Sequence, residues 1–420
     1  MRILMVAPGT RGDVAPMAGL GSALQQHGFE VAIAANPAYG PLVVSAGCEY
    51  RALPGDLTRI IQRTDSAEKP SFKDVRRSWQ ALGGYMEQAA RGTLAAAEAG
   101  ADVILANSVA PFAYDIAEAL ELPAIGAHLQ PVEPSGAYPP VLLGSGRDLG
   151  AVGNKVIGRR VLAGPAPYDA PGARIRRELG LPKLSRQAAD RRRRRNKATT
   201  LHGISPTVLP RPKDWHAGLV MAGYWWPPGQ RNWQPDPALA EFLAAGPRPV
   251  FIGFGSGAAV DVELALEAAQ IAGVRAVIQG GRVQSDDAIG IGEVPHEWLF
   301  PRMAAVVHHA GSGTTAAGLR AGVPAVCVPV FTDQPLWASR VAALGAGPEP
   351  IPYKQLTAAR LGQAIKAAVS TRSYAARAKA VAAAIAREDG VAPVLATLRN
   401  IPSRGQLSSH SALGGTLAAL

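Results

Sequence analysis

Short apolar runs alternate with longer amphipathic segments along most of this chain. The run at residues 2–7 is followed by a segment with helical spacing at 14–27 and by a second apolar run at 30–35. This order is typical of βαβ units, which assemble into a parallel sheet covered by helices on both faces. A second series of the same kind opens at residues 249–254. The sequence therefore predicts an α/β protein with two doubly wound domains.

The same spacing rules place the other elements and the domain limits. The first half has further predicted strands at 102–106 and 124–127, with helices at 73–99 and 111–120. The second half has further predicted strands at 276–279, 304–308 and 325–328, with helices at 262–272, 315–321 and 356–386 and another in the 390s. We expect domains at residues 1–215 and 246–400, a linker at 216–245 and a flexible tail at 401–420.

Composition narrows the kind of protein. A length of 420 residues with 48% hydrophobic content supplies a core for each domain. Cys48 and Cys327 lie far apart, so neither a disulfide framework nor a cysteine-rich metal site is expected, and a cytoplasmic location is predicted. No apolar run approaches the roughly 18 residues that a membrane-spanning helix needs. The net charge of +11 favours an anionic partner.

One loop in the second half has the features of a phosphate site. His308 and His309 are followed by Ala-Gly311-Ser312-Gly313-Thr314, which leads from a predicted strand into a predicted helix. The first turn of a helix has backbone N–H groups without partners and a partial positive charge. Gly311 and Gly313 allow an anion to approach closely, and His309 adds another hydrogen-bond donor. Glycines that serve turn geometry alone are the alternative interpretation.

The next strand also ends in polar residues. Asp333 and Gln334 follow the strand at 325–328, at the edge of a parallel sheet where such proteins bind ligands. Two neighbouring acceptors suit a polyhydroxylated ligand such as a sugar. Asp333 is also well placed to cap the helix beginning near Pro335, and the two roles are compatible.

These segments resemble a known family. The motifs are Val-Pro-His-Glu-Trp-Leu-Phe at 294–300, His-His-Ala-Gly-Ser-Gly-Thr-Thr at 308–315, Ala-Gly-Val-Pro at 321–324 and Thr-Asp-Gln-Pro at 332–335. Together they resemble the donor-binding signature of the nucleotide-sugar glycosyltransferases grouped with the UDP-glucuronosyltransferases. The bacterial branch with sterol-type glucosyltransferases and glycopeptide glycosyltransferases is the most similar. The resemblance implies the GT-B fold, in which two Rossmann-like domains face each other across a cleft.

The resemblance also implies roles in donor binding. His309 and the turn at 312–314 would hold the diphosphate, with Ser256 supporting it from the facing loop. The main chain at Val294, with Trp298, would meet the nucleobase. Asp333 and Gln334 would bind the sugar. UDP-glucose is the first donor candidate and a dTDP-sugar the main rival. No metal and no further cofactor are expected.

The first loop of the chain carries the expected catalytic base. In Gly9-Thr-Arg-Gly-Asp13, the resemblance places Asp13 where it would take the proton of the acceptor hydroxyl, in an inverting transfer of a hexose. A cap of the helix beginning at Val14 is the alternative, and a helix N-terminus would lower the pKa of Asp13. The segment at 105–108 offers no carboxylate as a partner.

The acceptor side is predicted least well. A hydroxylated natural product or lipid-like molecule is the expected acceptor. His128 follows the strand at 124–127 and is a weak candidate for contacting it. Trp79, Tyr85 and Phe112 can line an apolar pocket, although packing in a helix core explains them equally well.

Five consecutive arginines, Arg191 to Arg195, form the strongest local charge feature. A solvated helix face is the simplest interpretation. The functional alternatives are attraction of an acidic acceptor and peripheral contact with an anionic membrane. Nucleic-acid binding is not expected, since no aromatic platform or zinc motif accompanies the run. A nucleotide-sugar epimerase and a catalytically silent binding protein remain as alternative functions on this fold.

Overall fold

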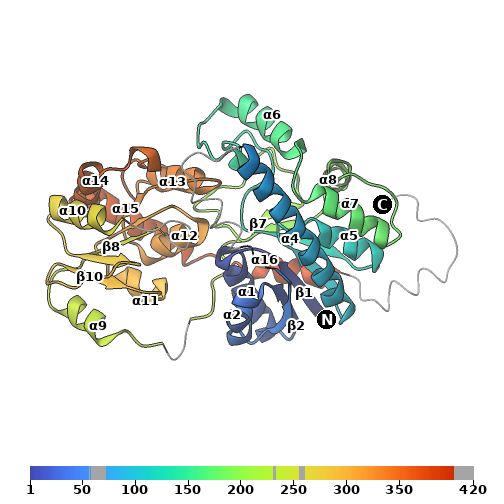
Figure 1. The fold of residues 1–420 in the computed structure, drawn as a ribbon, viewed down its shortest axis with the longest axis horizontal. Coiled ribbons are helices and arrows are strands. Elements are labelled where there is room, and N and C mark those ends of the chain that lie inside the picture. Colours follow the sequence, from blue (N-terminus) through green and yellow to red (C-terminus); the bar gives the residue numbers. More distant parts are fainter. Residues whose placement is uncertain (56, 58–71, 230–232, 255–260, 402–420) are drawn as a thin grey trace.

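The computed structural model describes residues 1–55, 57, 72–229, 233–254 and 261–401. Two lobes lie side by side along its longest axis, each built around its own parallel sheet (Figure 1). The predicted pair of doubly wound α/β units is confirmed. Ser256 and the predicted tail beyond Ile401 lie outside the described residues.

The N-terminal lobe contains a seven-stranded sheet of order β3-β2-β1-β4-β5-β6-β7, and all of its pairs are parallel. Its strands are β1 (Arg2–Ala7), β2 (Glu30–Ala35), β3 (Glu49–Ala52), β4 (Val103–Ala106), β5 (Ala124–His128), β6 (Thr200–His202) and β7 (Leu219–Met221). Its helices are α1 (Arg11–Gln26), α2 (Gly40–Ser45), α4 (Phe72–Glu98), α5 (Phe112–Ala119), α6 (Gly150–Ala163), α7 (Asp169–Glu178) and α8 (Arg186–Arg195), with short 3-10 helices η1 (Pro37–Tyr39) and η2 (Val141–Leu143).

The C-terminal lobe contains a five-stranded parallel sheet of order β10-β9-β8-β11-β12. Its strands are β8 (Val250–Gly253), β9 (Ala276–Gln279), β10 (Ala288–Ile291), β11 (Ala305–His308) and β12 (Ala325–Cys327). The helices that follow β7 are α9 (Pro237–Ala244), α10 (Val262–Ala272), α11 (His296–Leu299), α12 (Ser312–Ala321), α13 (Gln334–Ala343), α14 (Ala358–Ser370), α15 (Arg372–Ile385) and α16 (Ala392–Arg399), with η3 (Phe300–Arg302) and η4 (Tyr353–Gln355).

Alternating strand residues supply two cores to each lobe. In β1, Ile3 and Met5 face a core shared with α1 and α16, while Leu4 and Val6 face one shared with α4 and α5. This follows from the two-residue period of a strand, which points successive side chains to opposite faces. Since both faces of a parallel sheet are covered, its strands are apolar throughout.

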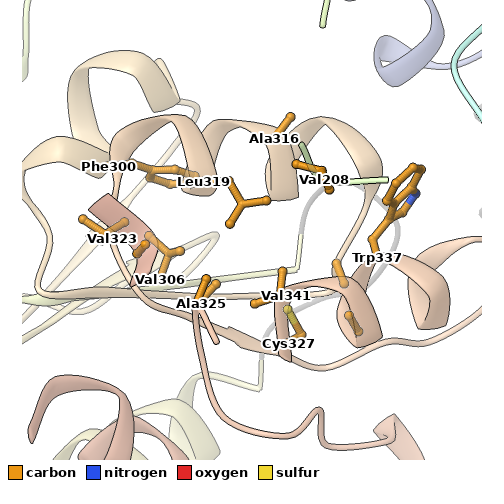
Figure 2. Close-up of a cluster of buried hydrophobic side chains, with 14 of the residues drawn as sticks. Val208, Phe300, Val306, Ala316, Leu319, Val323, Ala325, Cys327, Trp337 and Val341 are labelled. Carbon is orange, nitrogen blue, oxygen red and sulfur yellow. The ribbon is translucent and has the colours of Figure 1, made fainter. Parts of the chain in front are cut away.

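A core cluster in the C-terminal lobe lies beneath the loops that the sequence marks as functional. It joins α12 and α13 to β11 and β12 through Leu319, Trp337, Val306 and Cys327 (Figure 2). Trp337 is fully buried. The rigid packing of this cluster holds the starts of α12 and α13 in fixed positions.

Several elements differ from their predicted limits. Strand β7 and helix α9 lie inside the segment predicted as a linker, because such short elements give little sequence signal. Helix α16 falls in the predicted second domain, yet it packs against the core of the N-terminal lobe. The predicted helix at 356–386 is divided at Thr371 into α14 and α15. The exact domain limits stay a prediction.

Candidate active site

In each sheet the order of the strands along the chain changes direction at one pair of neighbouring strands. The candidate site residues lie in the loops that follow these two strands. In the N-terminal lobe this point lies between β1 and β4, and the loops after them lead to Asp13 and Asn107. In the C-terminal lobe it lies between β8 and β11, and the loop after β11 contains His309. Ligands of open α/β sheets bind in the crevice at such switch points.

Asp13 uses its two carboxylate oxygens differently. Its Oδ2 accepts a hydrogen bond from the backbone N–H of Thr10, the N-cap of α1, at 2.9 Å. Its Oδ1 accepts one from Asn107 Nδ2 at 3.4 Å. The helix begins at Arg11 rather than at Val14, because Thr10 is the N-cap and Asp13 the third helical residue. One oxygen caps the helix, and the other is turned toward β4.

The surroundings of Asp13 raise its pKa. Burial is the main cause, and the negative charge of Asp333 acts in the same direction. The hydrogen bonds from Thr10 and Asn107 act in the opposite direction and do not outweigh burial. The predicted lowering of this pKa by the helix N-terminus is therefore wrong, because removing the carboxylate from water has the larger effect.

Gly9 is required by this carboxylate. A Cβ at Gly9 would stand 2.0 Å from Asp13 Oδ2, well inside contact distance. The backbone therefore passes directly against Asp13, which keeps the carboxylate in one position.

The loop after β11 forms a helix start of the predicted type. Helix α12 begins at Ser312 with Gly311 as its N-cap, so the N–H groups of Ser312, Gly313 and Thr314 belong to its first turn. The ring of His309 packs against Gly311, where a Cβ would lie 2.5 Å from His309 Nε2. His309 Nδ1 is buried and has no hydrogen-bond partner among the described residues. Such an unpaired buried nitrogen is costly unless a ligand satisfies it.

Histidines at this site are neutral at physiological pH. Burial lowers the pKa of His296 and of His309 to about 4 and that of His308 to about 3. His308 Nδ1 accepts a hydrogen bond from the backbone N–H of Ala310 at 3.0 Å. Without a bound anion, these rings are therefore neutral, and the positive end of the site is the start of α12.

The backbone is strained on both sides of this site. Ala310 has φ of 61° and Thr332 has φ of 52°, values in the left-handed region that favours glycine. They lie in the loops after β11 and β12. Such conformations persist where the surrounding structure imposes them, often at ligand sites.

Asp333 and Gln334 are partly engaged within the protein. Asp333 is the N-cap residue of α13 without a side-chain capping bond, and its Oδ2 accepts a hydrogen bond from Trp337 Nε1 at 2.7 Å. Gln334 Oε1 accepts the backbone N–H groups of Val330 and Phe331 at 2.8 and 3.2 Å. The expectation of two free acceptors is wrong for Gln334, because its oxygen closes the loop before α13. Its amide nitrogen remains the group to offer a ligand.

The residues expected at the nucleobase lie on the loop before α11 and on α11 itself. Val294 precedes α11 and is partly exposed. The Trp298 ring lies 5.0 Å from the ring of Trp233, and the Arg302 guanidinium stands 4.2 Å from its centre. Trp298 thus belongs to an aromatic cluster at the surface of the C-terminal lobe.

Contacts across the two lobes bring the two groups of loops together. Arg11 at the start of α1 forms an ion pair with Glu293 at 3.5 Å. Gly144 and Gly146, which follow η2, pack against Thr332 and Pro335. The loops of Asp13 and Asp333 therefore face one space between the lobes.

The residues expected to contact the acceptor differ in their burial and surroundings. His128 ends β5, is 8% exposed, and lines a cavity of the N-terminal lobe. Trp79 is 46% exposed on α4. Phe112 is buried in the core shared by α4 and α5, and Tyr85 donates its hydroxyl hydrogen bond to Pro8 O at 2.8 Å within the same lobe. Phe112 and Tyr85 thus have the packing role that the sequence left open.

This cavity holds about 680 Å³ of empty space, part of it open to solvent. It runs from Asn107 past His128 and Glu133 to Arg193 and Arg194 on α8. The arginine run is therefore not a uniform solvated face. A helix turns successive side chains around its axis, so two of the five arginines point inward.

Sequence reasoning missed Asn107 and Glu133. The segment around Asn107 was set aside because it lacks a carboxylate, although its place directly after β4, the strand next to β1, marks it as part of the site. Glu133 lies in a proline-rich loop with no periodic pattern, so no sequence signal identifies it.

In the part of the chain that is described, no group of three or more His, Cys, Asp or Glu side chains has a geometry suited to a metal ion. Within the same residues, no helix combines the length and the apolar character needed to cross a membrane.

Comparison with known proteins identifies the family. Residues 3–138 match the glycosyltransferase family 28 N-terminal domain, and residues 254–400 match the C-terminal domain described as erythromycin biosynthesis protein CIII-like. The chain is 34% identical to O-mycaminosyltylonolide 6-deoxyallosyltransferase of Streptomyces fradiae, over 93% of this chain and 95% of that protein.

Two further similarities agree. The chain is 31% identical to a sterol 3-beta-glucosyltransferase of Eremothecium gossypii, over 93% of this chain, but it spans only 33% of that longer protein. The glycosyltransferase VinC, solved in complex with DTDP, shares the fold with a TM-score of 0.66 at 18% identity, over 95% of this chain and 99% of VinC. The chain belongs to the UDP-glucuronosyltransferase-like family of GT-B glycosyltransferases, enzymes that transfer a sugar from a nucleotide-sugar donor to an acceptor.

Proposed function

We propose that this enzyme transfers a hexose, with inversion and without a metal, from a nucleoside diphosphate sugar to a hydroxyl group of a natural-product or lipid-like acceptor. The acceptor binds to the N-terminal lobe and the donor to the C-terminal lobe. The proposal rests chiefly on Asp13, a buried carboxylate with a raised pKa that faces the donor-side loops from the opposite lobe.

In this mechanism Asp13 is the general base. The acceptor oxygen attacks the anomeric carbon while the bond from that carbon to the diphosphate breaks. The proton of the hydroxyl moves to Asp13, on the Oδ1 side that Asn107 also contacts. The bonding electrons leave with the diphosphate. A raised pKa makes the carboxylate a stronger base, as long as it stays ionised at the working pH.

The donor is bound through its diphosphate and its sugar. The N–H groups of Ser312, Gly313 and Thr314 and the unpaired Nδ1 of His309 hold the diphosphate. These donors stabilise the charge that develops on the leaving group, so no metal is needed for that task. The Asp333 carboxylate accepts hydrogen bonds from the sugar hydroxyls, and the Gln334 amide nitrogen donates hydrogen bonds to them. Val294 and Trp298 contact the nucleobase.

The donor is UDP-glucose or a dTDP-sugar. The sterol glucosyltransferase named above favours glucose as the sugar, and the 6-deoxyallosyltransferase favours a deoxyhexose. The DTDP complex of VinC favours a dTDP-sugar. Isothermal titration with UDP and with dTDP separates the two. The alternative function as an epimerase is disfavoured, because the relatives named above are transferases. An epimerase would convert the donor sugar in the absence of an acceptor.

The test of the mechanism is Asp13→Asn, which keeps the side chain's size and the cap on α1. Transfer should fall by about 10²–10⁴-fold, the usual contribution of a general base, while binding of the nucleoside diphosphate changes little. Asp236→Asn is the matched control, since Asp236 caps α9 away from the site. Near-normal transfer by Asp13→Asn would leave Asp13 with a capping role only. Proton NMR of the product's anomeric coupling tests inversion.

A further inference from the structure

The five arginines of α8 are divided by the geometry of the helix. Arg191, Arg192 and Arg195 are exposed, whereas Arg193 and Arg194 are half-buried and line the cavity that begins at Asn107. Figure 1 shows α8 on the N-terminal lobe near α5 and α7. The cavity connects these two guanidinium groups with the residue that contacts the proposed base.

Arg193 is fixed in place by its neighbours. Its guanidinium forms an ion pair with Asp190 one turn earlier on α8. It also stands over the ring of Tyr114, 4.2 Å from the ring centre. These contacts hold one edge of the cavity rigid and leave its charge nearly balanced.

Arg194 is held much more weakly. Among the described residues its one ion pair is with Glu133, at 3.9 Å, the outer limit for such a contact. Burial raises the pKa of Glu133, which favours the neutral carboxylic acid and weakens this pair further. The Arg194 guanidinium therefore has hydrogen-bond donors and positive charge to offer at the wall of the cavity.

His128 provides an independent sign of a missing partner. It is more than nine-tenths buried, it lines the same cavity, and its Nδ1 has no hydrogen-bond partner among the described residues. The pKa of His128 lies well below its usual value because of burial and the nearby charges, so the ring is neutral and offers one donor and one acceptor. A polar group of a ligand would satisfy it.

We propose that this cavity is an acceptor subsite for a carboxylate, which Arg194 binds with support from Arg193 while His128 makes a hydrogen bond to a neighbouring polar group of the same molecule. The inference rests on the proposed transfer function. It narrows the acceptor from any natural-product or lipid-like molecule to one with a carboxylate at some distance from the reacting hydroxyl.

The charge balance favours a monoanion. Asp190 pairs with Arg193 and with Arg186, and Arg186 also pairs with Asp169, whereas among the described residues Arg194 has only the distant Glu133. One negative charge restores the balance at Arg194, whereas a phosphate dianion leaves one charge in excess in a half-buried site. A planar carboxylate also matches the two parallel donors of a guanidinium.

The test compares two small hydroxylated probes that differ in one charge. These are 7-hydroxycoumarin-3-carboxylate and its ethyl ester, and their binding to the full-length enzyme is measured by equilibrium dialysis at pH 7.5 with UDP present. The carboxylate should bind about tenfold more tightly than the ester, the scale of one charge-assisted hydrogen bond. This preference should disappear in Arg194→Ala and Arg194→Gln and be partly kept in Arg194→Lys.

Arg195→Ala is the matched control, because it removes the same charge from the exposed side of α8. It should keep the preference, as should Arg191→Ala. The proposal is overturned if the wild type does not bind the carboxylate more tightly than the ester, or if the Kd of both probes exceeds about 1 mM. It is also overturned if Arg194→Ala keeps the preference for the carboxylate, or if Arg195→Ala loses this preference to the same extent. Tighter binding of the phosphate ester of 7-hydroxycoumarin than of the carboxylate would also overturn it. UDP binding and the melting temperature check that each variant is folded.

This readout is independent of catalysis. If Asp13→Asn retains transfer, the assignment of the base fails while the carboxylate preference in dialysis still stands. If the preference is absent but Asp13→Asn abolishes transfer, only the acceptor inference fails.

Discussion

The negative charge of Asp333, at the start of α13, raises the pKa of Asp13, on α1 of the opposite lobe. The two carboxylates therefore influence each other across the space between the lobes. Asp333, proposed to bind the donor sugar, thus makes Asp13, proposed to accept the proton of the acceptor hydroxyl, a stronger base. This coupling requires the loops of Asp13 and Asp333 to be close to each other, as they are in the structure.

Replacing Asp333 by Asn should shift the pH dependence of transfer. The base acts when ionised, so the rate rises with pH through the raised pKa of Asp13. Removing the charge at 333 lowers that pKa, because the like charge no longer opposes ionisation. The acid limb of kcat/KM should therefore move to lower pH, and kcat should also fall because a sugar contact is lost. Measurement of kcat/KM between pH 4 and 8 gives the limb.

Trp337→Phe separates these two effects. It removes the hydrogen bond to Asp333 Oδ2 and leaves the carboxylate, whose pKa then rises because this bond lowers it. The acid limb should therefore move to lower pH less than in Asp333→Asn, where the charge is absent at every pH. An unchanged limb in Asp333→Asn would show that the carboxylates do not interact in solution.

Asn107 should act as a positioning residue for Asp13. Asn107→Ala removes the hydrogen bond to Oδ1, which acts to lower the pKa of Asp13, so the acid limb should move to higher pH and kcat should fall about tenfold or less. Asn107→Asp places a carboxylate where the amide was, so the acid limb of kcat/KM should move to still higher pH. The same pH profile measures both.

A purely structural role for Asn107 would lower stability in both variants without a shift of the limb. Asn154→Ala is a control, since Asn154 is a buried asparagine whose side-chain nitrogen donates to Asp148 rather than to Asp13. The acid limb of kcat/KM in Asn154→Ala should stay at the same pH as in the wild type.

The sequence predicted the framework of the donor site well. The strand ending at His308, the glycine loop and the helix after it are local features, and the helix was misplaced only at its first turn, 315 instead of Ser312. That turn was missed because its small residues give no apolar period. The family resemblance pointed to Asp13, and its loop directly follows the apolar strand β1.

The acceptor side was not predictable in the same way. Asn107 meets Asp13 only because β1 and β4 are neighbours in the sheet, a pairing between distant segments. The inward turn of Arg193 and Arg194 depends on where α8 docks, which a run of identical residues cannot reveal. The engagement of Gln334 by the backbone of Val330 likewise depends on the loop conformation.

His309→Gln should weaken donor binding. The variant loses the half-buried ring that packs against Gly311, the N-cap of α12. Loss of one hydrogen bond to a charged group costs about 1.5–3 kcal/mol, so the Kd for the nucleoside diphosphate should rise by about 10- to 150-fold. Isothermal titration measures it. His27→Gln, on the exposed end of α1, is the control. An unchanged Kd would remove His309 from the diphosphate site.

Acid should destabilise the C-terminal lobe before its carboxylates are protonated. His296, His308 and His309 have pKa values of about 4, 3 and 4 in the folded protein, against about 6.5 in an unfolded chain. Between these values the unfolded chain binds more protons, so the free energy of unfolding falls as pH drops from about 6.5 to 4 and is constant above. Asp13 and Asp333 have raised pKa values and act in the opposite sense.

The measurement is the melting temperature between pH 4.5 and 8, with and without a saturating nucleoside diphosphate. Without it, the melting temperature should be level above about pH 6.5 and fall below, and His309→Gln should flatten the fall because one titrating ring is gone. Bound diphosphate attracts a proton to His309 and so should reduce the fall as well. A slope that is identical in the wild type and in His309→Gln would mean that this ring is not held neutral by burial.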